Sequence, residues 1–390
     1  MNSKLINRLL IRLPTYSLFV LAGLVLIAPT HFVYGQELVP EQVEIVKARV
    51  IQAGEVKKEI LAGTNTEVIS QDLRVEILQG TQTGTTIDVQ NDILPFREGD
   101  VFYLRHAYSA IDQIDRYAVS APNRLPALAL LGALFLAVLF FFGGWQGLRG
   151  LLALGGSLFV IVYLLLPGVL AGYPPVLVAM GISSLIVVLG SYITHGFKPV
   201  TTAAVMGMLL TIAITGLLAY FAIDLTKLTG FSGDEVVYLN FNTNGAIDLV
   251  GLLLGGIMIG LLGVLYDAAI GQAVAVEELR SAGNHLSPRE IYKRGIRIGR
   301  EHIGALVNTL AIAYVGVALP LLLLLRVSSD QPLLITINQE MFATEIVRTL
   351  VGSIGLILAV PITTAIAVWM LANRKGPTDG SAGHSHSHSH

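Results

Sequence analysis

The residues that could do chemistry are ionisable and hydroxyl-bearing side chains set within long apolar stretches. The clearest is Asp267, which follows the glycine-rich run 255–260 near the end of an apolar segment. A charge near the centre of a bilayer costs on the order of 3 kcal/mol or more, so a carboxylate there is the first candidate for function. Asp267 could bind a cation or relay a proton. The alternative is an interfacial carboxylate with its head group in water.

Hydroxyl and carboxamide side chains recur in pairs at three places in the apolar part of the chain. We expect these pairs to lie in the inner half of a membrane: Thr201 and Thr202, Asn308 and Thr309, Thr363 and Thr364. Glu301 precedes Asn308 by seven residues, which places both on one helix face. Together with Asp267, these side chains are predicted to line an inward-facing polar site for an ion or small solute. Alternatively, each hydroxyl bonds to its own helix and helps neighbouring helices to pack.

Other kinds of chemistry are poorly represented. The chain has no cysteine, which excludes disulfides, thiolate metal sites and a cysteine nucleophile. It has no HExxH, Gly-x-Ser-x-Gly or P-loop pattern, and no second carboxylate accompanies Asp267, so we expect neither an enzyme nor a cofactor. The C-terminal end could bind a metal ion if it is native rather than a purification tag, through His384, His386, His388 and His390.

The composition indicates where these residues must reside. Of the 390 residues, 53% are hydrophobic and 13% charged, far from the balance of a soluble domain. The net charge of −2 argues against nucleic acid as a partner. Apolar runs of about twenty residues, each long enough to cross a ~30 Å hydrocarbon core, predict a polytopic α-helical membrane protein. Seven transmembrane helices are expected, near 125–147, 151–172, 175–195, 200–222, 246–269, 303–325 and 348–371.

The first third of the chain has a different sequence pattern from the rest. Residues 1–35 begin with cations and continue as an apolar stretch, which is typical of a signal peptide and long enough for a signal anchor. Residues 36–123 alternate apolar and polar side chains between turn residues, which predicts an extracytoplasmic all-β domain of five strands. Five short strands suit a small OB-like barrel, either as a partner-binding domain or as a folded cap without a ligand.

The basic residues of the connecting segments predict the orientation, because Lys and Arg are retained on the cytoplasmic side. The expected cytoplasmic cations are Arg149, Lys198, the group between 280 and 300, Arg374 and Lys375. This arrangement places a seven-helix domain, 124–373, in a bacterial plasma membrane, with the β domain outside and the His-rich tail 374–390 in the cytoplasm. Ser287 and Glu290 form a capping box that predicts the start of a basic helix.

Three segments resemble the YibE/F-like family of multi-pass bacterial membrane proteins. They are Gly263-Val264-Leu265-Tyr266-Asp267-Ala268-Ala269, Gly299-Arg300-Glu301-His302-Ile303 and Asn308-Thr309-Leu310-Ala311-Ile312-Ala313-Tyr314. The likeness extends over most of the chain, from the external β segment through the last span. The resemblance implies a permease-like membrane protein and adds little about its activity. The His-rich end is not a feature of that family.

Two functions remain open from the sequence. The first is a secondary transporter or permease, an exporter or exchanger of an inorganic ion or small solute, with Asp267 as the coupling carboxylate. The alternative is a non-transporting membrane scaffold whose β domain binds an envelope partner. The expected partners are membrane lipid, a small solute or ion, and an envelope protein or a second copy of the chain.

Overall fold

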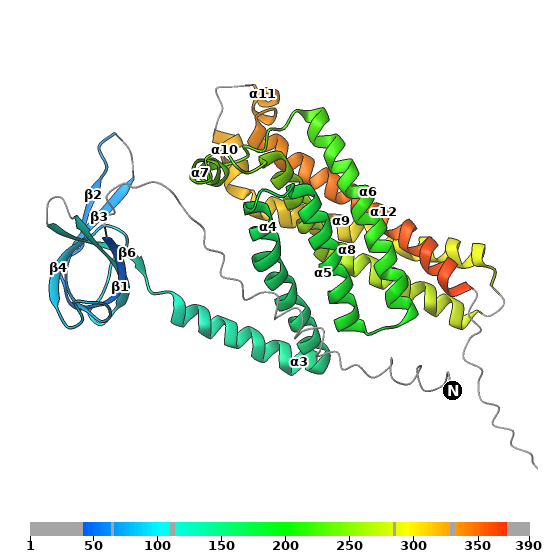
Figure 1. The fold of residues 1–390 in the computed structure, drawn as a ribbon, viewed down its shortest axis with the longest axis horizontal. Helices are drawn as coiled ribbons and strands as arrows, with labels where there is room; N and C mark the ends of the chain where they lie inside the picture. The colour runs from blue at the N-terminus through cyan, green and yellow to red at the C-terminus, as the bar shows by residue number, and fades with distance from the viewer. Residues whose placement is uncertain (1–41, 64–65, 110–113, 284–285, 328–331, 373–390) are drawn as a thin grey trace, which may run out of the picture. The chain divides into compact units, whose positions relative to one another are not determined.

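The structure is a computed structural model that describes residues 42–63, 66–109, 114–283, 286–327 and 332–372. The chain forms two compact units, residues 1–133 and 134–390 (Figure 1). The expected signal segment 1–35 lies outside the described residues, as does the tail with His384, His386, His388 and His390.

The first unit contains an antiparallel sheet of six strands, one more than the five that the alternating pattern predicts. The strands are β1 (Gln42–Ala53), β2 (Lys57–Ile60), β3 (Glu67–Ile77), β4 (Thr86–Asn91), β5 (Val101–Ser109) and β6 (Ile114–Pro122). Their hydrogen-bonded order is β2-β3-β1-β5-β6, and β4 pairs with β3. The sheet curls into a half-barrel (Figure 1). Its core consists of every second residue of the long strands, including Val46, Ala48 and Val50 of β1 and Val75 and Ile77 of β3.

Two buried carboxamides replace apolar packing on one side of this core. Gln71 donates from Nε2 to the carbonyl oxygens of Gly54 (3.1 Å) and Phe96 (2.9 Å). Its Oε1 accepts from the Phe96 N–H (2.9 Å) and from Asn91 Nδ2 (3.2 Å). Gln71 therefore satisfies the backbone of the connection between β4 and β5, which enters the core at Phe96.

Gln71→Leu is expected to destabilise the β domain by about 2–5 kcal/mol, because it leaves both backbone groups of Phe96 buried without partners. The exposed Gln90→Leu, on neighbouring strand β4, is the matched control and should cost under about 1 kcal/mol. Pulse proteolysis of the full chain in increasing urea, scored by cleavage within residues 42–122, measures both. Equal midpoints for the two variants would contradict this role of Gln71.

The remainder of the described chain is helical. Its elements are α3 (Leu125–Val160), the π-helix η1 (Ile161–Leu165), α4 (Leu166–Leu170), α5 (Pro175–His195), α6 (Pro199–Thr226), α7 (Asp234–Asn242), α8 (Leu249–Ala282), α9 (Pro288–Val317), α10 (Leu319–Val327), α11 (Leu333–Ile337) and α12 (Glu340–Ala372). Five helical stretches are long and apolar enough to cross a membrane, or six if the bent pair α9 and α10 is one span. Seven were expected from the sequence.

The difference in helix number arises mainly between residues 125 and 170. In the structure, Leu125–Leu170 is one apolar helical stretch of 46 residues, whereas the sequence predicts two spans there. A helix of this length would measure ~69 Å at 1.5 Å per residue, more than twice a ~30 Å hydrocarbon core. Gly144 interrupts it with a non-helical backbone (φ 50°, ψ −140°), a conformation that glycine adopts at little cost.

The expected span 303–325 is also not a single straight helix. The chain bends by 65° between α9 and α10. Pro320, the second residue of α10, explains the break, because proline supplies no N–H for the preceding turn and its ring clashes with that turn. At the other end of α9 the capping box is confirmed: Ser287 Oγ accepts from the Glu290 N–H (3.3 Å) and Glu290 Oε2 accepts from the Ser287 N–H (2.8 Å).

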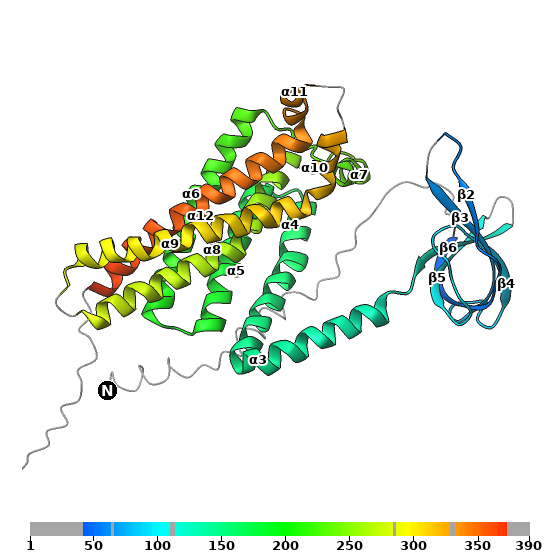
Figure 2. The same cartoon turned by 180° about the vertical axis from the view of Figure 1, so that it is seen from behind.

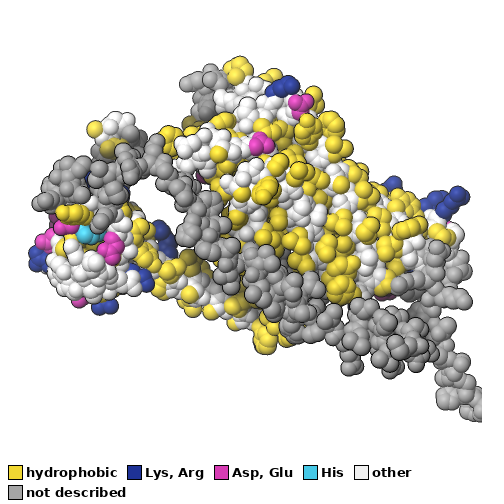
Figure 3. Space-filling model, in the orientation of Figure 1, with side chains coloured by type: hydrophobic (Ala, Val, Ile, Leu, Met, Phe, Trp, Pro, Cys, Tyr) yellow, Lys and Arg dark blue, Asp and Glu magenta, His cyan; other side chains and the backbone are white. Residues whose placement is uncertain are grey.

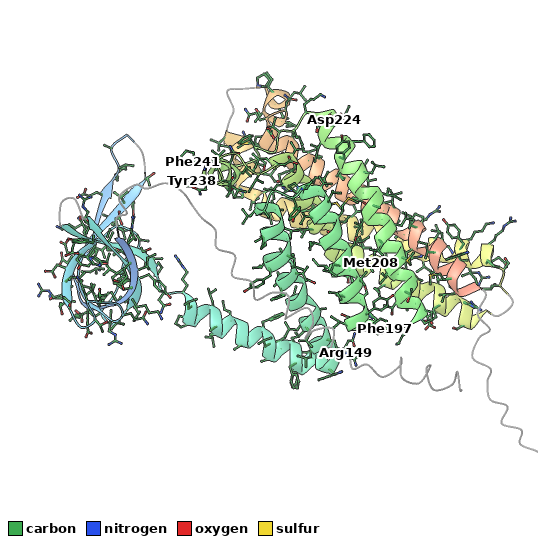
Figure 4. All side chains as sticks on the ribbon, in the orientation of Figure 1. Arg149, Phe197, Met208, Asp224, Tyr238 and Phe241 are labelled. Carbon is green, nitrogen blue, oxygen red and sulfur yellow. The ribbon has the colours of Figure 1, made fainter. Side chains whose placement is uncertain are left out.

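The core of the helical unit lies between α6, α8 and α12, and α9 packs along α8 and α12 (Figure 2). Met208 of α6 is fully buried there. Apolar side chains cover the side of the unit, whereas its Lys and Arg side chains gather at the ends (Figure 3). Asp224, Tyr238 and Phe241 lie at one end, and Arg149 and Phe197 lie at the other (Figure 4).

Candidate functional site

A cavity of about 270 Å³ lies between the helices at the end of the unit where α5, α8 and α12 begin. Its lining comes from η1 and α4 (Leu165, Val169), α5 (Pro175, Ala179), the segment around α7 (Gly230, Ser232, Val236), α8 (Leu249, Leu252, Leu253, Gly255, Gly256, Ile259) and α12 (Arg348). Most of this surface is apolar. Among the described lining residues, Arg348 has the one charged side chain.

The Arg348 guanidinium is only partly neutralised by the protein. Its Nη1 lies 2.9 Å from Oε1 of Glu345, one turn earlier on α12, and each side chain is 25% exposed. Its Nε is buried and has no hydrogen-bond partner among the described residues. A guanidinium has five N–H donors in a planar fork, so a single contact with Glu345 leaves donors for another anion.

Two further buried donors lie beside this arginine. Thr344 is on the same face of α12, one turn before Arg348, and Tyr314 of α9 packs against Gly260 and Gly352. The hydroxyls of Thr344 and Tyr314 are buried without a partner in the described part of the chain. Buried polar groups are nearly always hydrogen-bonded, so these two hydroxyls would suit ordered water, although neither residue lines the cavity.

Two other unpartnered hydroxyls in the helical core have a simpler explanation. Those of Thr215 and Thr363 are also buried without a partner in the described structure, but each presses on a glycine of a neighbouring helix, Gly355 and Gly207 respectively. They serve close packing of α6 on α12. The group around Arg348 differs because it combines a charge with an adjacent cavity.

The segment between α6 and α7 covers part of the cavity. The backbone N–H and the hydroxyl of Thr229 donate to the two carboxylate oxygens of Glu340, at 2.8 and 2.7 Å. Gly230 (φ 90°) packs so closely on α8 that a Cβ would lie 2.5 Å from the Leu249 carbonyl oxygen. These contacts hold Gly230 and Ser232 against the start of α8, whose N-cap is Asp248.

The structure does not gather the residues predicted from the sequence into one site. Four of them are exposed on the surface of the unit: Asp267 on α8 and Glu301, Asn308 and Thr309 on α9. Thr201, Thr363 and Thr364 are buried, with exposures of 3%, 0% and 0%, and Thr202 is half-buried. None of these residues lines the cavity beside Arg348.

Several of the predicted hydroxyls bond within their own helix. Thr202 Oγ1 donates to the Lys198 carbonyl oxygen (3.1 Å), and Thr309 Oγ1 donates to that of Ala305 (2.9 Å). Asp267 has a different setting, because it lies in line with the exposed glycines Gly256, Gly260 and Gly263 on one face of α8. In the described part of the chain, no group of three or more His, Asp or Glu residues could hold a metal ion.

Sequence reasoning missed Gln272, which joins three helices. The side chain is 5% exposed, and its Nε2 donates to Thr364 Oγ1 of α12 (2.7 Å) and to the Gly295 carbonyl oxygen of α9 (2.8 Å). The sequence pattern that could have indicated this contact was a single carboxamide in the apolar part of α8, together with Gly295 and Gly299, which are spaced four residues apart and so let another helix approach closely.

Sequence reasoning also missed Arg348 as a site residue, because it lies at the edge of the last predicted span, 348–371. The sequence signal was Glu345, three residues earlier, at the spacing of a helical ion pair.

These helices are long and apolar enough to cross a membrane, as the helices of a membrane protein are. The family model described as YibE/F-like protein matches residues 131–373, more than half of the chain, and the chain belongs to this family. The match begins after the β domain. The comparisons with curated proteins and with solved structures found no match.

Proposed function

We propose that this protein is a secondary transporter of the permease type that carries a small anionic solute or inorganic anion, as an exporter or exchanger. The supporting observation is Arg348, which lines a cavity between helices and whose buried Nε has no partner among the described residues. The cavity, at about 270 Å³, lies just below the range of roughly 300–1,000 Å³ that suits drug-sized ligands. An anion of a few heavy atoms therefore fits the available space and charge.

Glu345 suggests how binding is regulated in this proposal. A partly buried cation without a counter-ion is costly, and the ion pair with Glu345 partly neutralises Arg348. An arriving anion competes with Glu345 for the guanidinium. Removal of the negative charge of Glu345 would release Arg348 to the anion. Asp267 has no contact with the solute in this scheme, because it lies eleven residues beyond Gly256, ~16 Å along α8.

Flux measured in proteoliposomes tests the proposed function. The purified full chain would be reconstituted and exposed to formate, acetate, bicarbonate, nitrate, phosphate and sulfate, each with and without an imposed pH gradient. We expect saturable flux of at least one anion above that of protein-free liposomes. Absence of protein-dependent flux for every anion would contradict the proposal.

The proposed orientation is that expected from the basic residues: a bacterial plasma membrane, seven spans, the β domain outside and the C-terminus in the cytoplasm. The positions of Arg149 and Phe197 at one end and of Asp224 and α7 at the other support it (Figure 4). The residues from 125 to 170 would then form two spans that meet near Gly144.

The orientation can be measured directly because the chain contains no cysteine. Lys198→Cys and Glu235→Cys replace exposed residues at opposite ends of the helical unit. A membrane-impermeant maleimide added to intact cells is expected to label Glu235→Cys at least ten times faster than Lys198→Cys. Inverted membrane vesicles should show the reverse preference. Similar labelling of both cysteines from one side would contradict the topology.

The β domain gives a second candidate function, that of a scaffold that binds an envelope partner. An open concavity of about 500 Å³ on β3 and β4 is lined by polar residues that include Asp72, Arg74, Asp88 and Gln90. Arg74 Nε donates to Asp88 Oδ1 (2.9 Å), and this hydrogen bond lowers the pKa of the Asp88 carboxyl. We propose that β4, β3, β1, β5 and β6 correspond to a partly open OB-like barrel. Specific capture of an envelope glycan or protein, without anion flux, would favour this alternative.

A further inference from the structure

The first half of α9 carries a dense group of cations. Lys293, Arg294, Arg297 and Arg300 are all exposed. Within the described chain none of them forms an ion pair, and Glu301 beside them is exposed as well. Four uncompensated cations on about two helical turns repel one another, which makes this surface a strong attractor of anions.

These four cations border a groove of about 700 Å³ between α9 and α12. The other lining residues are Tyr292, Ile296, Ile303, Ile357, Val360 and Pro361. The described lining includes no acidic residue. The two helices approach closely here because Gly299 of α9 lies against Val360 and Gln272, where any Cβ would clash. The groove is therefore a feature of well-packed helices rather than of a loop.

The groove combines two chemistries that a free anion does not need. The cations come from α9, whereas α12 contributes only apolar residues, among which Ile357 is 40% exposed. Arginine binds phosphate through paired N–H donors, and an acyl chain would cover Ile303 and Ile357. The helices that form the groove, α9 and α12, lie side by side (Figure 2), and the groove residues are at the end where the sequence predicts the cytoplasmic leaflet.

We propose that this groove binds one anionic phospholipid, with its phosphate on Arg297 and Arg300 and one acyl chain along α12. The site is separate from the Arg348 cavity and shares no lining residue with it. It fixes the basic start of α9 to the inner leaflet. Its existence does not depend on transport.

Native mass spectrometry of the full chain in detergent tests this site, with phosphatidylglycerol and phosphatidylcholine of identical acyl chains. The wild-type protein is expected to retain phosphatidylglycerol preferentially. Arg297→Gln with Arg300→Gln should weaken this binding roughly 30-fold, from about 1 kcal/mol for each cation near an anionic headgroup. Inorganic phosphate at millimolar concentration should not displace the lipid, because it cannot occupy the apolar part of the groove.

The matched control is Lys198→Gln with Arg289→Gln, which removes two exposed cations that do not line the groove. Retention of phosphatidylglycerol by this control, alongside its loss in the first pair, supports the site. Equal loss in both pairs would mean a diffuse charge effect and would overturn the proposal. Displacement by inorganic phosphate would also overturn it, because the site would then be one for a free anion.

A second measurement keeps all cations in place and so does not depend on the folding of the double variant. Ile357→Trp introduces a fluorophore at an exposed position in the groove. Phosphatidylglycerol brominated on its acyl chains is expected to quench this tryptophan at least threefold more than brominated phosphatidylcholine at equal mole fraction, after subtraction of the wild-type signal. Equal quenching by the two lipids would contradict a selective site.

Discussion

Arg348→Gln is expected to abolish saturable anion flux, whereas Glu345→Gln is expected to increase anion affinity. The first substitution removes the charged donor that adjoins the cavity. Hydrogen bonds to charged groups contribute about 1.5–3 kcal/mol, so its loss should weaken binding by roughly 10- to 100-fold. The second removes the carboxylate that competes with the solute for the guanidinium. Both effects are read from concentration dependence of flux in proteoliposomes and of thermal stabilisation by the same anion.

The opposite signs separate the site from a general loss of structure. Each variant breaks the same Arg348–Glu345 pair, so a purely structural effect would move anion affinity in the same direction in both. Arg326→Gln on α10 is the control, because it removes an exposed cation elsewhere in the chain. It should leave flux within about twofold of wild type. A loss of anion affinity in Glu345→Gln equal to that in Arg348→Gln would refute the competition between Glu345 and the solute.

Gly207→Ala is expected to destabilise the helical unit more than any comparable change at its surface. A Cβ at this position would lie 3.0 Å from the Cα of Thr363, so α6 and α12 would have to move apart. Overpacking of this kind typically costs about 1–3 kcal/mol. Because the Cα of Thr363 is in the way as well as its short, β-branched side chain, we expect the upper part of this range. The midpoint of thermal unfolding, followed by tryptophan fluorescence, should fall by about 5 °C or more.

Gly263→Ala provides the matched control for this prediction. It is the same substitution in the interior of a long helix, α8, but nothing lies within 4 Å of the added Cβ. Alanine favours helix over glycine by up to about 1 kcal/mol, so the unfolding temperature should stay constant or rise slightly. If Gly207→Ala and Gly263→Ala shifted the midpoint equally, close contact between α6 and α12 would not be what stabilises the bundle.

The secondary structure could be predicted in large part because it depends on local patterns. Alternation over residues 67–77 placed β3, and the unbroken apolar run after Pro175 placed α5. The prediction failed at segments whose conformation depends on pairing with a distant part of the chain. The segment Lys57–Ile60 is mostly charged and fully exposed, and it becomes β2 only because Glu67–Ser70 pairs with it. Pro320 was a local signal of the break between α9 and α10 that apolar length alone obscured.

The candidate site could be predicted less well, for a physical reason. The sequence shows that Asp267 and Asn308 are polar in an apolar context, but not which face of the helix meets a neighbour. Both side chains are on exposed faces, while Gln272, one turn beyond Asp267, is buried between three helices. Whether a side chain on a helix is exposed or buried changes when its position shifts by only one or two residues around the helix axis. Only contacts between helices distant in sequence specify it.

The central claim is that Arg348 makes the cavity selective for anions, and cysteine reactivity at Ser232 measures this most directly. Ser232→Cys is nearly isosteric, lines the cavity and would be the sole cysteine of the chain. We predict that an anionic methanethiosulfonate reacts there at least fivefold faster than a cationic one of similar size, and that Arg348→Gln reverses or abolishes this preference. A faster reaction with the cationic reagent in the presence of Arg348, or a preference unchanged in Arg348→Gln, would contradict the proposed anion site.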